Sequence, residues 1–243
     1  MPDAGELERF LAAARVDPAV FALRPDYRAA LVAVDGIPAG GGEGGTAALV
    51  ADAEAYAREL LAASPVDELP HVAAWREAYR AFGAKPQRTR NSLEALLRRA
   101  AADGLPQVNP LTDLYNAVSV LHQVPLGGED LTGYLGAPRL IRAVGDEPFD
   151  TVAAGEDVVE HPEPGEVVWC DEVGVTCRRW NHRQGRRTRL TEETSRALFI
   201  LDALAPLTDE AVAAAVQALV DRIAELGPGI TVTTRVLAPE GDD

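Results

Sequence analysis

The chain has 243 residues, 47% of them hydrophobic, and a formal net charge of −15 at pH 7. This is enough apolar sequence to bury a full core, but no apolar run reaches the ~18 residues that a membrane-spanning helix needs. Two cysteines, Cys170 and Cys177, are too few for a disulfide framework or a cysteine zinc site. The acidity also argues against indiscriminate binding of nucleic acid, because the overall field repels phosphate.

In chain order, hydrophobic periodicity predicts mixed α and β structure. The predicted helices cover residues 7–15, 46–63, 72–82, 91–102, 111–121 and 208–226. The predicted strands cover residues 31–34, 139–144, 166–170, 175–180, 197–204 and 230–237. Ser92 is expected to cap the fourth helix, and residues 125–130 are expected to form turns. The sequence Thr-Glu-Glu-Thr at 191–194 matches a helix capping box, although the apolar run after it is strand-like.

These elements predict one α+β domain in which a mixed sheet packs with helices. We expect residues 1–69 to form an N-terminal helical and strand portion that packs on this domain, residues 70–237 to form its main part, and residues 238–243 to form an acidic tail. No repeat is visible. The N-terminus lacks the basic start and apolar segment of a signal peptide, so we expect a cytoplasmic protein with no membrane contact. The cysteines flank a predicted hairpin turn and could pair, but thiols fit a reducing cytoplasm better.

Several site types find no support in the sequence. The glycine run 40–45, predicted as a flexible loop, lacks the Gly-Lys-Ser/Thr ending of a phosphate-binding loop. None of the four histidines is three or four residues from another, so a helical metal motif is missing. A Gly-x-Ser-x-Gly nucleophile motif is missing as well. We therefore expect neither a metal nor another cofactor.

Charge is concentrated in two cationic islands. Residues 85–99 hold five basic residues against Glu94, a net charge of +4, and residues 178–191 hold six arginines and no acid, a net charge of +6. Such islands can hold phosphates at contact distance, where distant charge is screened, and arginine suits bidentate phosphate contacts. The alternatives are a solvated hairpin and loop, or an arginine bias that follows from genomic base composition. The hypothesis is that both islands lie on one face and form an RNA footprint.

Six blocks of the sequence carry a resemblance. Residues 75–86 (WREAYRAFGAKP), 90–99 (RNSLEALLRR), 108–116 (VNPLTDLYN), 125–130 (PLGGED), 178–181 (RRWN) and 188–194 (TRLTEET) resemble, in this order, freestanding B3/B4 domain proteins. The resemblance covers roughly residues 70–237. The same domain in the β chain of bacterial phenylalanyl-tRNA synthetase removes tyrosine wrongly attached to the tRNA by hydrolysing the ester. The resemblance implies an α+β editing-domain fold whose pocket receives the aminoacylated 3′ end of tRNA.

The chain departs from the synthetase pattern at two positions. The synthetase domain has a Gln-Pro-x-His-Ala-Phe-Asp stretch with its histidine at the editing pocket, and alignment on Pro125 and Asp130 puts Gly127 at that position. The synthetase carboxylate that recognises the tyrosyl hydroxyl aligns with Asp202 only after a shift of one residue. Catalysis by the family histidine is therefore not inherited, and tyrosine specificity is unsupported.

The candidate site residues follow from the cationic islands, the polar neighbours of Trp180 and the resemblance. The predicted RNA-binding residues are Arg88, Arg90, Arg178, Arg179, Arg183, Arg186, Arg187 and Arg189. The predicted substrate-binding residues are Asn116, Trp180, Asn181, Glu192, Thr194 and Asp202, and the candidates for catalysis are His122, Asn181, His182 and Thr188. Trp180 either stacks on a base of the RNA end or belongs to the hairpin core.

Glu192 or Asp202 would receive the α-amino group of the substrate. Asp202 ends an apolar run, so it lies either at the exposed end of its strand or in a pocket. In our hypothesis it faces the pocket and is paired with Arg196 or Arg178 while the site is empty.

The resulting hypothesis is an editing-like domain that hydrolyses mischarged aminoacyl-tRNA in trans. Water would be the nucleophile, and positioning together with oxyanion donors would supply the acceleration of an already reactive ester. One alternative is a non-catalytic module that binds an amino acid or a small metabolite in the same pocket. Another is a tRNA-binding or protein-interaction adaptor without a competent pocket.

Overall fold

The computed structural model describes residues 4–41 and 45–239, so parts of the predicted glycine loop and acidic tail lie outside it. Its helices are α1 (Ala4–Ala13), α2 (Pro18–Leu23), α3 (Ala47–Ala63), α4 (Pro70–Ala81), α5 (Ser92–Ala102), α6 (Pro110–Leu121) and α7 (Asp209–Ala224), with short 3₁₀ turns η1 (Ala39–Gly41), η2 (Val66–Glu68) and η3 (Leu131–Gly133). Its strands are β1 (Arg15–Val16), β2 (Arg28–Asp35), β3 (Leu126–Asp130), β4 (Arg139–Arg142), β5 (Phe149–Ala153), β6 (Glu156–Glu160), β7 (Val167–Cys170), β8 (Val175–Arg178), β9 (Arg183–Gln184), β10 (Arg196–Ala203) and β11 (Thr231–Leu237).

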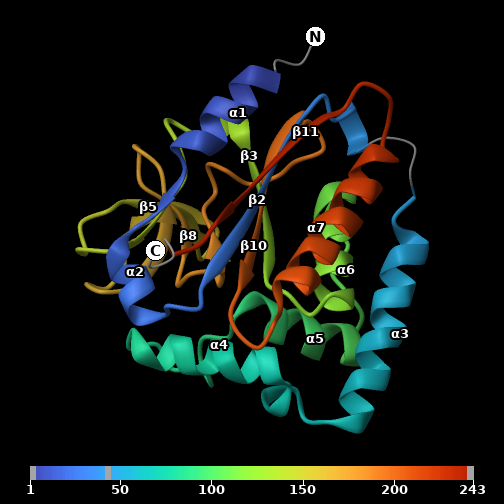
Figure 1. The fold of residues 1–243 in the computed structure, drawn as a ribbon, viewed down its shortest axis with the longest axis horizontal. Coiled ribbons are helices and arrows are strands. Elements are labelled where there is room, and N and C mark those ends of the chain that lie inside the picture. The colour runs from blue at the N-terminus through green and yellow to red at the C-terminus, as the bar shows by residue number, and fades with distance from the viewer. Residues whose placement is uncertain (1–3, 42–44, 240–243) are drawn as a thin grey trace.

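Two larger sheets organise the molecule (Figure 1). The central one has four antiparallel strands in the order β11-β2-β10-β3. The second has the order β1-β4-β7-β8-β9 and is mixed, because β1 runs parallel to β4 while the other neighbours are antiparallel. The α+β prediction with a mixed sheet is confirmed. Strands β5 and β6 form a separate hairpin.

The central sheet is buried on both faces, which explains why β2 and β10 read as continuous apolar runs. Leu31 and Ala33 of β2 belong to one core, with Trp75 of α4 and Trp169 of β7. The alternate residues of β2 belong to a second core, beneath α6 and α7. Since successive side chains in a strand point to opposite faces, each strand supplies both cores. The second sheet, α1 and α4 therefore cover one face, and α6 and α7 cover the other (Figure 1).

The N-terminal residues are part of this core. Strand β2 pairs with β10 over its full length, and β11 pairs with the other edge of β2. Helix α1 packs its buried Leu7 and Leu11 into the same core as Trp75. Residues 1–69 thus contribute an inner strand of the central sheet.

Three local predictions are wrong. Residues 125–130 do not form turns, because Leu126–Asp130 is strand β3, held by its pairing with β10. Asn91, not Ser92, caps α5, since its Oδ1 accepts a hydrogen bond from the backbone N–H of Glu94 at 2.9 Å. The capping box at 191–194 starts no helix, because a turn there leads directly into β10.

Both cysteines are buried free thiols, as expected. Cys177 lies opposite Trp169 in the β7–β8 ladder, so the two cysteines are not cross-strand partners. Within residues 4–41 and 45–239, no helix combines the length and hydropathy that crossing a membrane would take.

Candidate functional site

A cavity of about 240 Å³ lies between the two larger sheets. Five parts of the fold form its walls: α5, α6, the β3–β10 pair, the β7–β8 pair and the segment that follows β8. The lining residues are Ser92, Ala95, Leu96, Tyr115, Asn116, Leu126, Gly127, Glu129, Trp169, Cys177, Trp180, Asn181, His182, Arg183, Gln184, Ile200 and Asp202. Most of this surface is apolar, with a few convergent polar groups, which is the usual composition of a small-molecule site.

Strand register explains how two carboxylates reach the same cavity. On β10, Leu198, Ile200 and Asp202 alternate onto one face of the sheet. In the β3–β10 ladder Glu129 lies opposite Leu198, and Gly127 lies opposite Ile200. Directly opposed residues share a face, so Glu129 and Asp202 lie on the same side, four positions apart along β10. At about 3.3 Å per residue, the two backbone positions are separated by about 13 Å along the strand.

Asp202 is buried, with 3% of its surface exposed. Tyr27 donates its hydroxyl hydrogen to Oδ1 at 2.6 Å, and Nδ2 of Asn181 donates to Oδ2 at 3.3 Å. Burial raises the pKa of Asp202 to about 7, although these two hydrogen bonds partly oppose the rise. An incoming cation would favour the ionised carboxylate, so Asp202 is suited to hold an ammonium group.

Asp202 therefore faces the cavity and is not at an exposed strand end. The two predicted arginine partners are wrong. Arg196 is six residues away on the same strand, about 20 Å, and pairs with Glu6 and Asp35 instead. Arg178 follows Cys177 in β8, and since Cys177 lines the cavity, the side chain of Arg178 points to the opposite face.

Glu129 is the second buried carboxylate, 1% exposed, and it accepts a hydrogen bond from the hydroxyl of Tyr134. Burial raises its pKa to about 7, opposed by the hydroxyls of Tyr134 and Thr176. The cavity thus has an acidic group at each end of one β-sheet face and no buried cation among the residues that line it.

Two tryptophans bring unused hydrogen-bond donors to the cavity. Trp169 and Trp180 both line it and are 1% and 0% exposed. Neither indole Nε1 forms a well-aligned hydrogen bond within residues 4–41 and 45–239, although the indole of Trp180 lies near the hydroxyl of Tyr27. Trp169 lies near Asp202 and lowers the pKa of that carboxyl without completing a well-aligned bond. Buried donors without partners are costly, and a ligand acceptor would satisfy them.

Trp180 belongs to the core and offers no ring face to an RNA base. Its ring meets Tyr27 edge-on at 4.9 Å and Trp75 at 5.1 Å between centroids. The structure thus places Trp180 in the core and gives the stacking role no support. Strand β8 ends at Arg178, two residues earlier than predicted, and Arg179 and Trp180 both have positive φ, 49° and 67°. Two such non-glycine residues in succession are strained, and this turn delivers Asn181 and His182 to the cavity.

His182 is positioned as an acceptor at the cavity wall. Its Nδ1 is 2.7 Å from the backbone oxygen of Arg90, which can only accept, so Nδ1 carries the hydrogen. Burial lowers the pKa of His182 below its usual value, so the neutral ring leaves Nε2 free to accept a proton. His122, by contrast, follows α6 and does not line the cavity.

The family follows from a comparison of sequences. The B3/4 domain family model matches residues 74–226. The chain belongs to the B3/4 domain family. No curated protein sequence matches it. Among solved structures, an N-terminal fragment of the phenylalanyl-tRNA synthetase β-subunit from Pyrococcus horikoshii is similar, with 13% identity and a TM-score of 0.44. The match covers 90% of this chain and 50% of that fragment, so the chain spans about half of its length.

In this B3/4 domain, Gly127 has a local partner. An ideal Cβ at Gly127 would lie 2.9 Å from Nε2 of Gln184, and that Nε2 donates to the backbone oxygen of Gly128 at 2.9 Å. The amide of Gln184 therefore lies over the position where the synthetase pattern has its histidine. Sequence reasoning missed Gln184, Glu129 and Trp169, because only the β8–β9, β3–β10 and β7–β8 ladders bring them to the cavity.

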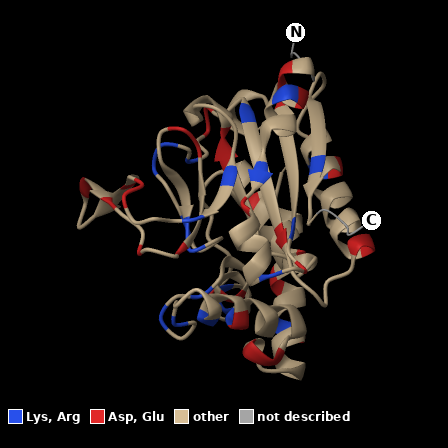
Figure 2. Ribbon diagram, turned by 60° about the vertical axis from the view of Figure 1, so that its left-hand side comes forward, with Lys and Arg blue, Asp and Glu red and all other residues tan. Residues whose placement is uncertain are grey.

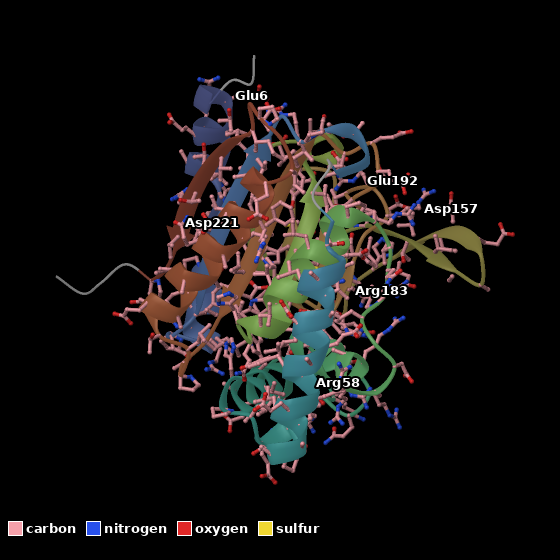
Figure 3. The ribbon with its side chains drawn as sticks, turned by 90° about the vertical axis from the view of Figure 1, so that its right-hand side faces the viewer. Glu6, Arg58, Asp157, Arg183, Glu192 and Asp221 are labelled. Atoms are coloured by element: carbon pink, nitrogen blue, oxygen red, sulfur yellow. The ribbon has the colours of Figure 1, made fainter. Side chains whose placement is uncertain are left out.

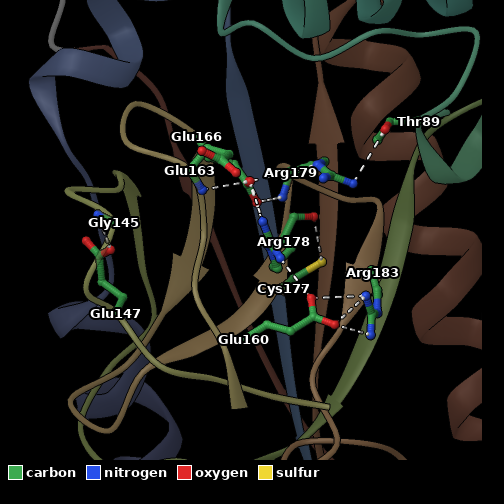
Figure 4. Close-up of polar contacts among 10 residues, drawn as sticks. All are labelled: Thr89, Gly145, Glu147, Glu160, Glu163, Glu166, Cys177, Arg178, Arg179 and Arg183. Atoms are coloured by element: carbon green, nitrogen blue, oxygen red, sulfur yellow. Dashed lines mark hydrogen bonds and ion pairs between the residues drawn. The ribbon is translucent and has the colours of Figure 1, made fainter. Parts of the chain in front are cut away.

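The cationic segment 178–189 of this B3/4 domain is largely neutralised by acids. Arg178 is 7% exposed and forms ion pairs with Glu166 at 2.8 Å and Glu160 at 3.0 Å (Figure 4). Glu160 also pairs with Arg183 at 3.3 Å. Arg187 forms two hydrogen bonds of 2.8 Å with the buried Asp171. Most arginines of this segment are therefore not free to bind phosphate.

The β5–β6 hairpin supplies several of these acids. It projects from the body with Asp157 on it (Figure 3). Asp157 and Asp150 both pair with Arg186, the latter at 3.1 Å. Arg189 is exposed and has no side-chain partner among the residues that the structure describes. Of the predicted RNA-binding arginines in this segment, Arg189 alone thus lacks an acidic partner within the described chain, and Arg179 has only a 3.8 Å contact with Glu166.

Other predicted residues lie away from the cavity. Glu192 is exposed on the loop before β10 (Figure 3). Thr194 donates its hydroxyl hydrogen to Asp130 at 2.6 Å. Thr188 is buried and its hydroxyl has no partner within the described chain, but it does not line the cavity. The structure thus brings together Asn116, Trp180, Asn181, His182, Arg183 and Asp202, and leaves Glu192, Thr194, Thr188 and His122 outside.

The two cationic islands are neighbours. Nη1 of Arg179 is 3.5 Å from Oγ1 of Thr89, and His182 bonds to the backbone of Arg90. Figure 2 shows Lys and Arg gathered on the loop between α4 and α5. No group of three or more His, Cys, Asp or Glu side chains within residues 4–41 and 45–239 is arranged to hold a metal ion.

Proposed function

We propose that this B3/4 domain binds the aminoacylated 3′ end of a mischarged tRNA and hydrolyses its ester in trans, in the cytoplasm. One observation carries the proposal: a single cavity holds both a buried acceptor, Asp202, and unpartnered donors on Trp169 and Trp180. An aminoacyl group presents the complementary pair, an ammonium and an ester carbonyl. A purely apolar or a purely anionic ligand would leave one of these sets unsatisfied.

In this proposal, His182 is the general base. The oxygen of a bound water attacks the ester carbonyl carbon while its proton moves to Nε2 of His182. The indole N–H groups are the donors available to the oxyanion that develops on the carbonyl. The bond to the ribose oxygen then breaks, and that oxygen takes the proton back from His182. The products are a free amino acid and a tRNA with its terminal hydroxyl restored.

The test is deacylation of a panel of misacylated tRNAs by the purified protein. Wild-type protein should accelerate the decay of at least one of them. A general base contributes about 10²–10⁴-fold, so His182→Gln should lower the turnover rate by about 100-fold or more. His122→Gln is the matched control, because His122 is a half-buried histidine outside the cavity. Decay at the spontaneous rate, with tight binding of an amino-acid analogue, would identify a binding module instead.

A further inference from the structure

A second cavity of about 240 Å³ opens beside the first. It lies between the loop that follows α4 and the turn that follows β8. Its charged and polar lining consists of Lys85, Arg88, Thr89, Glu163, Glu166 and Arg179. Both cationic islands thus contribute residues to this second cavity, which lies where the two segments touch.

The two cations that the first island contributes to this cavity have no acidic partner among the described residues. Lys85 and Arg88 are both exposed, and the side chain of neither forms a hydrogen bond or an ion pair with any described residue. This separates them from Arg178, Arg183, Arg186 and Arg187, which acids already neutralise. Charges that are free of partners are the ones that can bind an external anion without first breaking an ion pair.

The side chain of Arg179 forms only a weak ion pair. This side chain is 34% exposed, and its Nε lies 3.8 Å from Glu166, at the outer limit of an ion pair. The carboxylate of Glu166 is already engaged by Arg178 at 2.8 and 2.9 Å (Figure 4). Glu163 is the remaining acid and is exposed. Three cations therefore face one carboxylate that is not neutralised, and the cavity is net positive.

The two cavities share a wall. Arg179 lines the second cavity, and the next four residues, from Trp180 to Arg183, line the first. The contact between His182 and the backbone of Arg90 fixes this turn against the loop that carries Arg88. The second cavity is therefore the neighbouring site for a strand whose end occupies the first.

We propose that the second cavity binds a phosphate of the nucleic-acid strand whose aminoacylated end occupies the first cavity. The source of the phosphate rests on the proposed function, whereas the anion site rests on its own residues. Arg88 and Arg179 can each donate two hydrogen bonds to phosphate oxygens, and Lys85 adds an ammonium group as a further donor. The arginines of segment 178–189 with closer ion pairs are structural and contribute little to RNA affinity; these are Arg178, Arg183, Arg186 and Arg187.

The experiment measures binding of uncharged tRNA at a series of salt concentrations. The test variant is Lys85→Ala with Arg88→Ala. The matched control is Arg186→Ala with Arg222→Ala, which removes the same charge from two exposed arginines that are paired with Asp150 and Glu225. Loss of one phosphate contact lowers the salt slope by about 0.7 for a single strand, so the test variant should lose about 0.7 and the control almost nothing. Equal loss in both variants, or none in either, would overturn the site.

Three further measurements separate this site from the proposed function. Binding of an amino-acid ethyl ester, which has no phosphate, should be unchanged in the test variant if the cavities act separately. Wild-type protein that binds tRNA with the expected slope but hydrolyses no ester would remove the proposed function and leave the phosphate site standing. Binding of inorganic phosphate that depends on Lys85 and Arg88, without any tRNA binding, would overturn the nucleic-acid source.

Discussion

Replacing Asp202 by Asn should flatten the dependence of stability on pH. The carboxyl is buried and its pKa is raised from 3.8 to about 7, chiefly by burial. Between these two values the folded state holds the proton that the unfolded state has lost, so the free energy of unfolding falls as pH rises. At 1.36 kcal/mol per pH unit, Asp202 removes about 3 kcal/mol between pH 5 and pH 8. The amide does not titrate, so Asp202→Asn should lack this loss.

The assay is urea denaturation of the empty protein at pH 5 and pH 8. At pH 5 the variant should be slightly less stable, because Asn keeps an acceptor for Tyr27 but changes the contact with Asn181, a loss of about 1 kcal/mol. At pH 8 it should be more stable than wild type. Glu59→Gln, an exposed glutamate on α3, is the control and should follow wild type. The reasoning is refuted if the stability of wild type and variant changes equally between the two pH values.

The same substitution should weaken ligand binding. If Asp202 holds the ammonium group, its loss should reduce affinity for an amino-acid ester by about 10–150-fold, equivalent to about 1.5–3 kcal/mol for a hydrogen bond to a charged group. A variant that is more stable at pH 8 yet binds more weakly would show that the buried carboxylate is kept for function. Unchanged affinity would remove Asp202 from the site, whatever the stability data show.

Two further substitutions test the packing around the site. Asp171→Asn should destabilise the fold by about 1.5–3 kcal/mol at pH 7, the range for hydrogen bonds to a charged group. Burial tends to raise the pKa of Asp171, but the paired guanidinium and three backbone N–H groups lower it. Urea denaturation should therefore show the difference in stability shrinking as pH falls below the usual carboxyl range, and a constant difference would contradict this. Gly128→Ala places a Cβ 2.7 Å from Cδ1 of Leu190 and should cost about 1–3 kcal/mol, whereas Gly127→Ala meets only the movable amide of Gln184 and should leave the melting temperature nearly unchanged; the opposite order would count against the packing described here.

Local pattern determined much of the secondary structure. The helices predicted at 46–63, 111–121 and 208–226 agree with α3, α6 and α7 to within two residues at either end, because their apolar residues recur at the helical period and Pro or Thr marks their starts. The runs 31–34 and 197–204 are recognisably buried strands, since both faces of the central sheet are covered. The blocks that resemble B3/B4 proteins also lie in the local sequence, and the family match confirms them.

Tertiary pairing decided what the local pattern could not. The Leu-Gly-Gly-Glu-Asp stretch is poor in strand-forming residues, and it is a strand because β10 supplies its hydrogen bonds. Arg178 resembled a phosphate ligand in sequence, since its partners Glu160 and Glu166 are 18 and 12 residues away. Sequence gives the sum of charge in a segment, whereas only the fold decides which acid faces which arginine.

The cavity shows most clearly which features local sequence predicts and which only the tertiary structure decides. Asn181, His182 and Asp202 could be proposed from the sequence because they follow family blocks or interrupt apolar runs. Glu129 and Trp169 could not, because nothing local distinguishes a cavity-facing position from its neighbours. Strand side chains alternate with a period of two, so a slip of one residue between β3 and β10 would have turned Glu129 to the opposite face of the sheet. Register between strands about 70 residues apart is set by the packing of both cores together, and it is this packing that places two carboxylates and two unpartnered indole N–H groups around one cavity.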